Sequence, residues 1–183
     1  MKGDKYGTHR VIEPKGYLPQ PAIKLDNDFS KLYSNEILID VMFLNIDSSS
    51  FTQIENEANK DTKKIGEIIL KIVDDRGKMQ NPVTGSGGML VGVVEKIGDD
   101  LKEKVEIKEG DIIASLVSLS LTPLKINKIK EIYLDRDQVE IDGKAVLFES
   151  GVFVKLPDDI NLRTSLSILD VAGAPIQVAR IVK

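Results

Sequence analysis

The amino-acid sequence predicts a mainly β protein with a few helices, whose short strands form a barrel or a sandwich. Between residues 89 and 156, short β-rich runs follow one another with turn residues between them and without helices. Ahead of them, residues 35–45 (NEILIDVMFLN) alternate apolar and polar residues and then become wholly apolar, as a strand entering a core does. Strands this short and closely spaced favour an all-β core with helices added to it.

Composition limits the possible classes of protein. A length of 183 residues gives room for one domain, or for one domain and a fragment of the next. Apolar residues make up 42% and charged residues 30%, which is typical of a globular protein with a hydrophobic core. The 25 basic and 29 acidic residues give a net charge of −4 without a basic stripe, which argues against nucleic acid or an anionic membrane as a partner. Cysteine is absent, which excludes disulfides and thiolate chemistry. No apolar run has the character of a signal peptide or a membrane span, so we expect a soluble, cytoplasmic protein.

The first third of the chain predicts an arm, a strand and a helix. Prolines and glycines recur in residues 1–30, which indicates an irregular arm. The strand at residues 35–45 ends before serines 48–50, which are suited to capping a following helix. Residues 61–76 form the clearest helix, with Asp61 or Thr62 as its cap and Gly77 as its stop signal. One apolar stripe runs along it, most simply as core packing: Ile65, Ile68, Ile69, Ile72 and Val73.

The remaining chain predicts strands and then a helix. The strands are expected at residues 89–97, 111–119, 129–134, 138–141, 144–148 and 152–156. Asp142-Gly143 has the composition of a two-residue hairpin turn. From residue 161 onward the pattern is helical, with Pro175 suited to a helix start.

The glycines of residues 85–88 (GSGG) lead directly into an apolar strand. Glycine lets the backbone adopt positive φ and lets another group approach closely. The run lacks the third glycine of a dinucleotide fingerprint and precedes a strand, so it is not a nucleotide motif. No other glycine-rich turn between a strand and a helix appears in the sequence.

This order of elements resembles the catalytic, GroES-like domain of the medium-chain dehydrogenases. The resemblance rests on the opening strand, on the glycine-rich turn within residues 80–99, on the Gly110-Asp111 turn and on residues 145–159 (AVLFESGVFVKLPDD). It implies a partly open β-barrel over residues 31–160, preceded by an arm at 1–30. Residues 161–183 then resemble the helix that leads into a missing NAD-binding Rossmann domain.

Longer blocks resemble one NAD-dependent group of amine dehydrogenases from lysine fermentation. These blocks are KYGTHRVIEPKG, LNIDSSSFTQI, RGKMQNPVTGSGGML, ASLVSLSLTPLKI and LDVAGAPIQ. The resemblance implies oxidative deamination of the C3 amine of 3,5-diaminohexanoate, which gives 5-amino-3-oxohexanoate, ammonia and NADH. It also implies a homo-oligomer joined through the missing half, and a fragment that is inactive alone because NAD is bound mainly by that half.

The positions that hold catalytic zinc in other members of the superfamily carry poor ligands in this chain. Asp47 falls at or near the first position, Ser86 at the second, and Val171 or Asp170 at the third. Serine and valine do not suit zinc, and a lone aspartate does not hold it. We therefore expect no metal.

The resemblance places the candidate site residues at two turns and one helix. Asp47 is the first candidate for the general base or for the ion-pair partner of a substrate ammonium, and simple capping of the Ser48-Ser49 turn is its alternative. Ser49 falls where zinc members carry the hydroxyl of a proton relay. Ser86 and Gly87 replace a histidine and an acid, and they either make room for the substrate or form a tight turn. Asp170 is expected to face the same cleft, or to cap a helix.

His9 and Arg10 are candidates for binding the substrate. His9 is the only histidine and suits proton transfer, and Arg10 suits a bidentate clamp on the substrate carboxylate. A structural role in the arm is the alternative for both residues.

Two other classes of function remain open at this point. A free-standing GroES-like module for binding or assembly shares the fold without catalysis. A zinc-independent dehydrogenase acting on another amine or alcohol shares both the fold and the reaction type.

Overall fold

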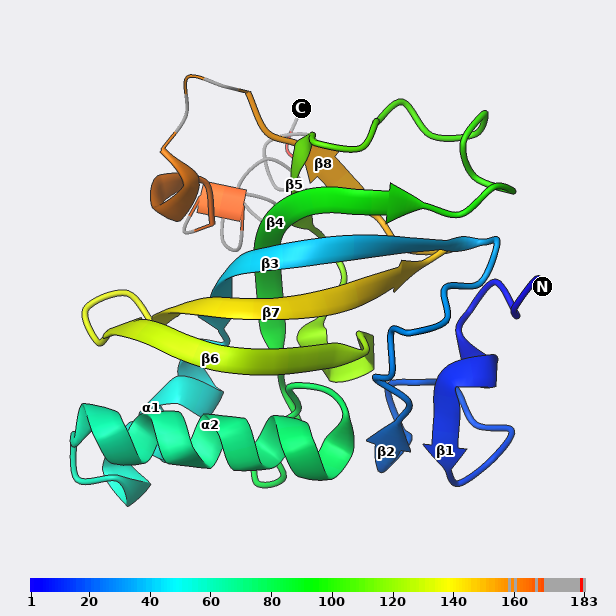
Figure 1. Ribbon diagram of the computed structural model, residues 1–183. Coiled ribbons are helices and arrows are strands. Elements are labelled where there is room, and N and C mark those ends of the chain that lie inside the picture. The colour runs from blue at the N-terminus through cyan, green and yellow to red at the C-terminus, as the bar shows by residue number, and fades with distance from the viewer. Residues whose placement is uncertain (158, 160, 167, 170–181, 183) are drawn as a thin grey trace.

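The computed structural model describes residues 1–157, 159, 161–166, 168–169 and 182 (Figure 1). Its elements follow the order η1 (Thr8–Arg10), β1 (Val11–Glu13), β2 (Lys24–Leu25), β3 (Glu36–Ile46), α1 (Ser48–Glu57), α2 (Thr62–Arg76), β4 (Gly88–Ile97), β5 (Ile112–Ser115), η2 (Leu119–Leu121), β6 (Leu124–Tyr133), β7 (Gln138–Phe148) and β8 (Phe153–Lys155). In addition, residues 162–166 are helical. Among the described residues, no helix has the length and apolar character needed to cross a bilayer.

The architecture is a six-stranded antiparallel sheet with helices against one end. The strand order is β6-β7-β3-β4-β5-β8, so β3 lies inside the sheet between β7 and β4, and β6 and β8 are the edges. Those two edge strands do not pair with each other, so the sheet curves without closing into a barrel. The prediction of a mainly β, partly open barrel with a few helices is therefore confirmed.

Helix α2 forms as its sequence predicts. The Asp61 carboxylate accepts hydrogen bonds from the amides of Lys63 and Lys64, and Gly77 ends the helix with φ 66°. Its apolar stripe is largely buried against the sheet. Gly66 lies at the contact with β6, where an added Cβ would be 3.5 Å from a methyl group of Ile129.

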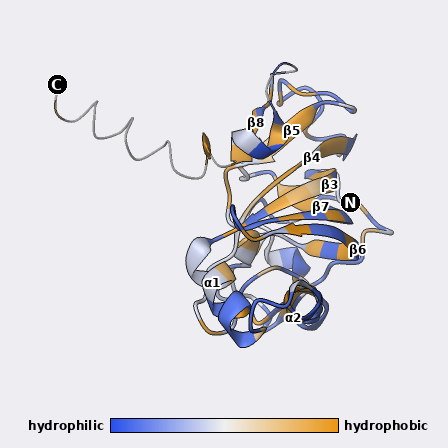
Figure 2. Ribbon diagram, turned by 90° about the vertical axis from the view of Figure 1, so that its left-hand side faces the viewer, coloured by the Kyte–Doolittle hydropathy of each residue, from blue (hydrophilic) through white to orange (hydrophobic). Residues whose placement is uncertain are grey.

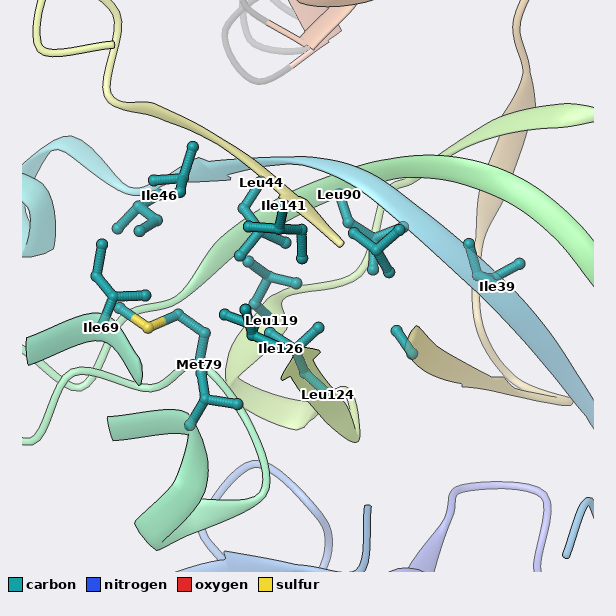
Figure 3. Close-up of a cluster of buried hydrophobic side chains, with 14 of the residues drawn as sticks. Ile39, Leu44, Ile46, Ile69, Met79, Leu90, Leu119, Leu124, Ile126 and Ile141 are labelled. Carbon is teal, nitrogen blue, oxygen red and sulfur yellow. The ribbon is translucent and has the colours of Figure 1, made fainter. Parts of the chain in front are cut away.

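The main core lies between the sheet and α2 and consists mostly of aliphatic side chains (Figure 3). Ile39 and Leu44 from β3, Leu90 from β4 and Ile141 from β7 meet Ile69 and Met79 in this layer. Figure 2 shows the apolar residues concentrated in the strands and the polar residues on the outer side of α2. This core fixes the orientation of the C-terminal end of β3, from which the candidate site is built.

One local prediction is wrong. Asp142 and Gly143 do not form a hairpin, because β7 continues through them and the turn between β6 and β7 lies at residues 134–137. Gly143 serves close packing instead, since an added Cβ would be 2.5 Å from the Lys125 carbonyl oxygen on β6. A helix does follow the serines, as their capping character allowed: residues 48–57 form α1, although its N-cap is Asp47.

The predicted irregular arm contains a small ribbon of its own. Strands β1 and β2 pair with each other and not with the main sheet. Val11, Ala22 and Leu25 form a separate buried cluster beneath the ribbon. The arm also carries Arg10, whose side chain is buried among polar groups at the start of β3.

Candidate functional site

Asp47 is held at the junction between β3 and α1. It is the N-cap of α1, and its Oδ1 accepts the Ser49 amide at 3.0 Å and the Ser49 hydroxyl at 2.6 Å. A side-chain oxygen at this position satisfies an amide that has no partner within the helix, which explains the local geometry. The Ser86 hydroxyl and the Ser50 amide also hydrogen-bond to the carboxylate. The capping alternative is thus correct as geometry, and the same carboxylate also lines a cavity.

The glycine-rich turn lies directly against Asp47. The Asp47 amide donates to the Gly87 carbonyl oxygen at 3.1 Å. A Cβ on Gly87 would meet the Ser120 amide nitrogen at 2.5 Å, and one on Gly88 would meet the Asn45 carbonyl oxygen at 1.9 Å. Both glycines are therefore required by close backbone packing. The turn leads into strand β4 and not into a helix, so it lacks the helix N-terminus of a dinucleotide cradle.

A cavity of about 350 Å³ opens at this junction. It is lined by Asp47, Ser86, Gly87, Gly88, Met89, Leu116, Val117, Ser118 and Leu169. The lining thus combines one carboxylate and two hydroxyls with an apolar wall, and among the described residues it includes no lysine, arginine or histidine. This combination suits a small ligand that carries a positive charge next to an alkyl segment.

The hydrogen bonds around Asp47 keep it negatively charged. The hydroxyl of Ser49 lowers the pKa of the Asp47 carboxyl, against a smaller opposing effect of burial, and the Ser49 amide and Ser86 hydroxyl lower it further. The carboxylate is therefore ionised at neutral pH. A lowered pKa also makes it a weak proton acceptor, which suits an ion pair with an ammonium group better than general-base chemistry.

Two residues that the sequence analysis did not select belong to the same site. The hydroxyl of Ser50 lies 2.6 Å from that of Ser86 and 2.5 Å from that of Thr84. Ser50 is fully buried although it is a serine in the first turn of α1. Nothing in its local sequence distinguishes it from Ser48 and Ser49, because its partners are more than thirty residues away.

The structure places His9 and Arg10 outside this cavity, at the opposite end of β3. Arg10 donates from Nε to Glu36 Oε1 and from Nη2 to Glu36 Oε2, each at 2.8 Å. His9 Nε2 also lies 2.8 Å from Glu36 Oε1, and its Nδ1 accepts the Asp4 amide at 3.0 Å. An extended strand rises about 3.3 Å per residue, so about 36 Å of extended chain separates Glu36 from Asp47. His9 and Arg10 are thus both bound to Glu36, which agrees with the alternative that they have a structural role in the arm.

The remaining predicted positions concern the crossing helix and the metal. Asp170 lies outside the described residues, although Leu169 before it lines the cavity. Within the described part of the chain, no group of three or more His, Cys, Asp or Glu side chains is arranged to hold a metal ion. The absence of metal remains a prediction.

The fold and this site define the class of domain. An open antiparallel sheet, with a cavity where its long central strand meets a glycine-rich turn, is consistent with a partly open GroES-like domain. The profile described as the L-erythro-3,5-diaminohexanoate dehydrogenase N-terminal domain matches residues 9–157. The chain therefore belongs to the L-erythro-3,5-diaminohexanoate dehydrogenase family and contains its N-terminal domain.

Two curated relatives agree with this assignment. The L-erythro-3,5-diaminohexanoate dehydrogenase of Acetoanaerobium sticklandii is 66% identical over 183 residues, which cover 100% of this chain and 53% of the relative. The protein of the same name from Fusobacterium nucleatum subsp. nucleatum is 64% identical over 182 residues, covering 100% of this chain and 52% of the relative. The chain thus spans about half the length of the curated relatives it matches.

Proposed function

We propose that this chain is the substrate-side part of an NAD-dependent dehydrogenase that acts on L-erythro-3,5-diaminohexanoate. In the proposed reaction the diamino acid, NAD⁺ and water give 5-amino-3-oxohexanoate, ammonium, NADH and a proton. The names of the two relatives support the substrate and the reaction class. NAD accepts the hydride, and its site belongs to sequence outside the described residues, since these contain no glycine-rich turn suited to a dinucleotide.

The observation that carries this proposal is the ionised Asp47 carboxylate in a cavity whose described lining includes no basic residue. Ser49 holds Oδ1 through its amide and its hydroxyl, which fixes the carboxylate in the wall of the cavity. At neutral pH the substrate carries two ammonium groups and one carboxylate. The anionic lining favours an ammonium group at this position and disfavours the substrate carboxylate.

We assign Asp47 to binding the substrate ammonium next to the reacting carbon. Its second proposed role, as general base, is less favoured because hydrogen bonding lowers its pKa. Met89 and Leu116 provide the apolar wall for the alkyl chain. Ser49 and Ser86 orient the carboxylate, while a contribution from Asp170 to the same cleft stays a prediction.

The test compares two aspartates in the full-length protein. Asp47→Asn removes the charge from the cavity, and Asp137→Asn is the matched control. Asp137 also accepts a serine hydroxyl, from Ser48 at 2.6 Å, but it does not line the cavity. Its φ of 55° is well tolerated by asparagine.

We expect Asp47→Asn to weaken kcat/KM for 3,5-diaminohexanoate by roughly 10- to 100-fold, the range for a hydrogen bond to a charged group. Asp137→Asn should stay within about twofold of the wild type, because surface changes have small effects. Equal behaviour of the two variants would contradict the role of Asp47. Activity of the wild type on simple alcohols but not on the diamino acid would favour a dehydrogenase of another specificity. Absence of any dehydrogenase activity would favour the binding module.

A further inference from the structure

A chain of hydroxyl groups connects Asp47 with the far side of the glycine-rich turn. The Ser49 hydroxyl is 3.3 Å from that of Ser86, which is 2.6 Å from that of Ser50. The Ser50 hydroxyl is in turn 2.5 Å from that of Thr84. The chain alternates between α1, which carries Ser49 and Ser50, and the turn, which carries Thr84 and Ser86.

Counting protons fixes the direction of these hydrogen bonds. Each hydroxyl has one proton to donate, and Ser49 donates its proton to the ionised Asp47, which can only accept. The Ser86 hydroxyl also bonds to the Asp47 carboxylate, so its proton is directed toward Ser49 and Asp47. Ser50 then donates to the Ser86 hydroxyl, or at 3.4 Å to the Ser86 carbonyl oxygen, and Thr84 donates to Ser50.

Hydrogen bonds aligned in this way strengthen one another, because each donor is polarised by the bond that it accepts. The charge on Asp47 is therefore also stabilised by the Ser50 and Thr84 hydroxyls, which do not contact it. Ser50 is the central member of the chain. It is 0% exposed, so its hydroxyl has no bulk water as an alternative partner.

We propose that Ser50 is a positioning residue for substrate binding, because it orients the Ser86 and Ser49 hydroxyls toward Asp47 and thereby keeps that carboxylate ionised and correctly placed. This inference rests on the proposed role of Asp47. It predicts that removing a hydroxyl three or four hydrogen bonds away from the carboxylate along this chain changes the pH dependence of the enzyme.

The direction of the expected shift in the pKa of Asp47 follows from the effect of the hydrogen-bond donors on the carboxylate. Hydrogen bonds to the carboxylate favour its charged form, so losing them raises the pKa of Asp47 toward the ordinary value. The acidic limb of the kcat/KM profile then moves to higher pH. KM should rise more than kcat falls, because the group acts on binding.

The most informative variant is Thr84→Val in the full-length protein. Thr84 is exposed, and valine has nearly the same shape, so the variant removes the first donor of the chain together with a long contact, 3.4 Å, from the Ser86 amide. Thr84→Ser retains the hydroxyl and should restore the wild-type acidic limb. Ser50→Ala removes the central donor and should have the larger effect, a loss of roughly threefold to tenfold in kcat/KM near the acidic limb, as for one neutral hydrogen bond.

Ser48→Ala is the matched control for Ser50→Ala. Ser48 is a serine of the same helix turn, but it donates to Asp137 and not toward Asp47. An acidic limb that moves in Thr84→Val and Ser50→Ala, and stays in place in Ser48→Ala and Thr84→Ser, would support the proposal. Unchanged limbs in all four variants would overturn it, as would a shift in Ser48→Ala equal to that in Ser50→Ala.

A second readout separates this inference from the proposed function. The titration of Asp47 in ¹³C-aspartate-labelled full-length protein, assigned with Asp47→Asn, does not require turnover. If the wild type fails to oxidise 3,5-diaminohexanoate, the proposed function fails. A higher titration midpoint of Asp47 in Thr84→Val and Ser50→Ala, without one in Ser48→Ala, would still establish the directed hydroxyl chain, and equal midpoints would exclude it.

Discussion

The guanidinium of Arg10 and the carboxylate of Glu36 form a bidentate ion pair that is buried on both sides. The two bonds are 2.8 Å long, and the side chains are 1% and 0% exposed. Arg10 also donates to the carbonyl oxygens of Asp28 and Lys31 at 2.8 Å each. Through this one side chain the N-terminal arm is joined to the first residue of β3.

Replacement of Glu36 should destabilise the protein without a direct effect on substrate binding. Glu36→Gln leaves the buried Arg10 charge without its counter-charge, which costs roughly 3–5 kcal/mol for a pair of this kind. Chemical denaturation of the variant at pH 7 measures this loss. A large rise in KM with an unchanged free energy of unfolding would instead support a role of His9 and Arg10 in substrate binding.

The same carboxylate should make stability depend on pH. Burial alone would raise the pKa of Glu36, but hydrogen bonds from Arg10, His9 and the Tyr33 amide outweigh it and lower the pKa from 4.5 to about 2. Since the folded state holds the proton less tightly, the contribution of Glu36 is complete above about pH 5 and is lost as the pH falls toward 2. It amounts to about 3 kcal/mol. Denaturation midpoints of the wild type and Glu36→Gln should therefore converge below pH 3. A difference between the two midpoints that stays constant with pH would contradict this account.

Lys78 should produce a dependence of stability on pH at the alkaline end. Burial, with the positive charge of Arg76 nearby, lowers its pKa from 10.5 to about 7. Its Nζ donates to the carbonyl oxygens of Pro19 and Gln20 at 2.7 and 3.0 Å. Because the unfolded chain binds the proton more tightly, stability should increase between pH 7 and pH 10.5.

Lys78→Met should remove this increase, and Lys71→Met should retain it, because Lys71 is exposed and paired with Asp75. Urea denaturation of the wild type and both variants at pH 7 and pH 10 measures the difference. A wild type whose stability does not rise relative to Lys78→Met would show that Lys78 stays charged in the folded protein.

Glycine substitutions should separate packing from backbone conformation in the glycine-rich turn. Gly87→Ala places a methyl group 2.5 Å from the Ser120 nitrogen and 2.8 Å from the Met79 carbonyl oxygen. Since these are backbone atoms, the turn must move, and we expect a loss of several kcal/mol of stability together with a displaced Ser86. Gly85→Ala meets no atom within 4 Å and bears only the strain of φ 75°, about 1–2 kcal/mol. Calorimetric melting of both variants tests this order, and equal losses would contradict the packing argument.

The sequence predicted the parts of the fold that local signals determine. Helix α2 has a cap, a periodic stripe and a glycine stop, and all three are present in the structure. The serines before α1 indicated a helix start, but its extent was not predicted because its few buried residues, Ser50, Phe51 and Ile54, are embedded in polar ones. The prediction of a hairpin at Asp142-Gly143 was wrong. Local sequence rules assign such a glycine to a turn, but Gly143 is needed for close contact with the backbone of β6.

The candidate site was predictable only where a turn could be recognised. Asp47, Ser49, Ser86 and Gly87 were placed together from the resemblance, and the structure brings all four to one junction. The partner of Arg10 was not found, since Glu36 is 26 residues away, although a glutamate at the start of an apolar strand is an unusual signal. The role of Asp170 is still a prediction.

The position of β3 has a consequence for how the chain folds during synthesis. This strand lies inside the sheet, but its partners β4 and β7 end only at residues 97 and 148. At roughly 5–20 residues per second, the ribosome supplies the second partner about 5–20 s after β3 has been made. Throughout that interval an apolar strand of eleven residues has an open edge. We therefore expect folding to be slow and chaperone-dependent, as is typical of proteins whose central pairings join distant parts of the sequence.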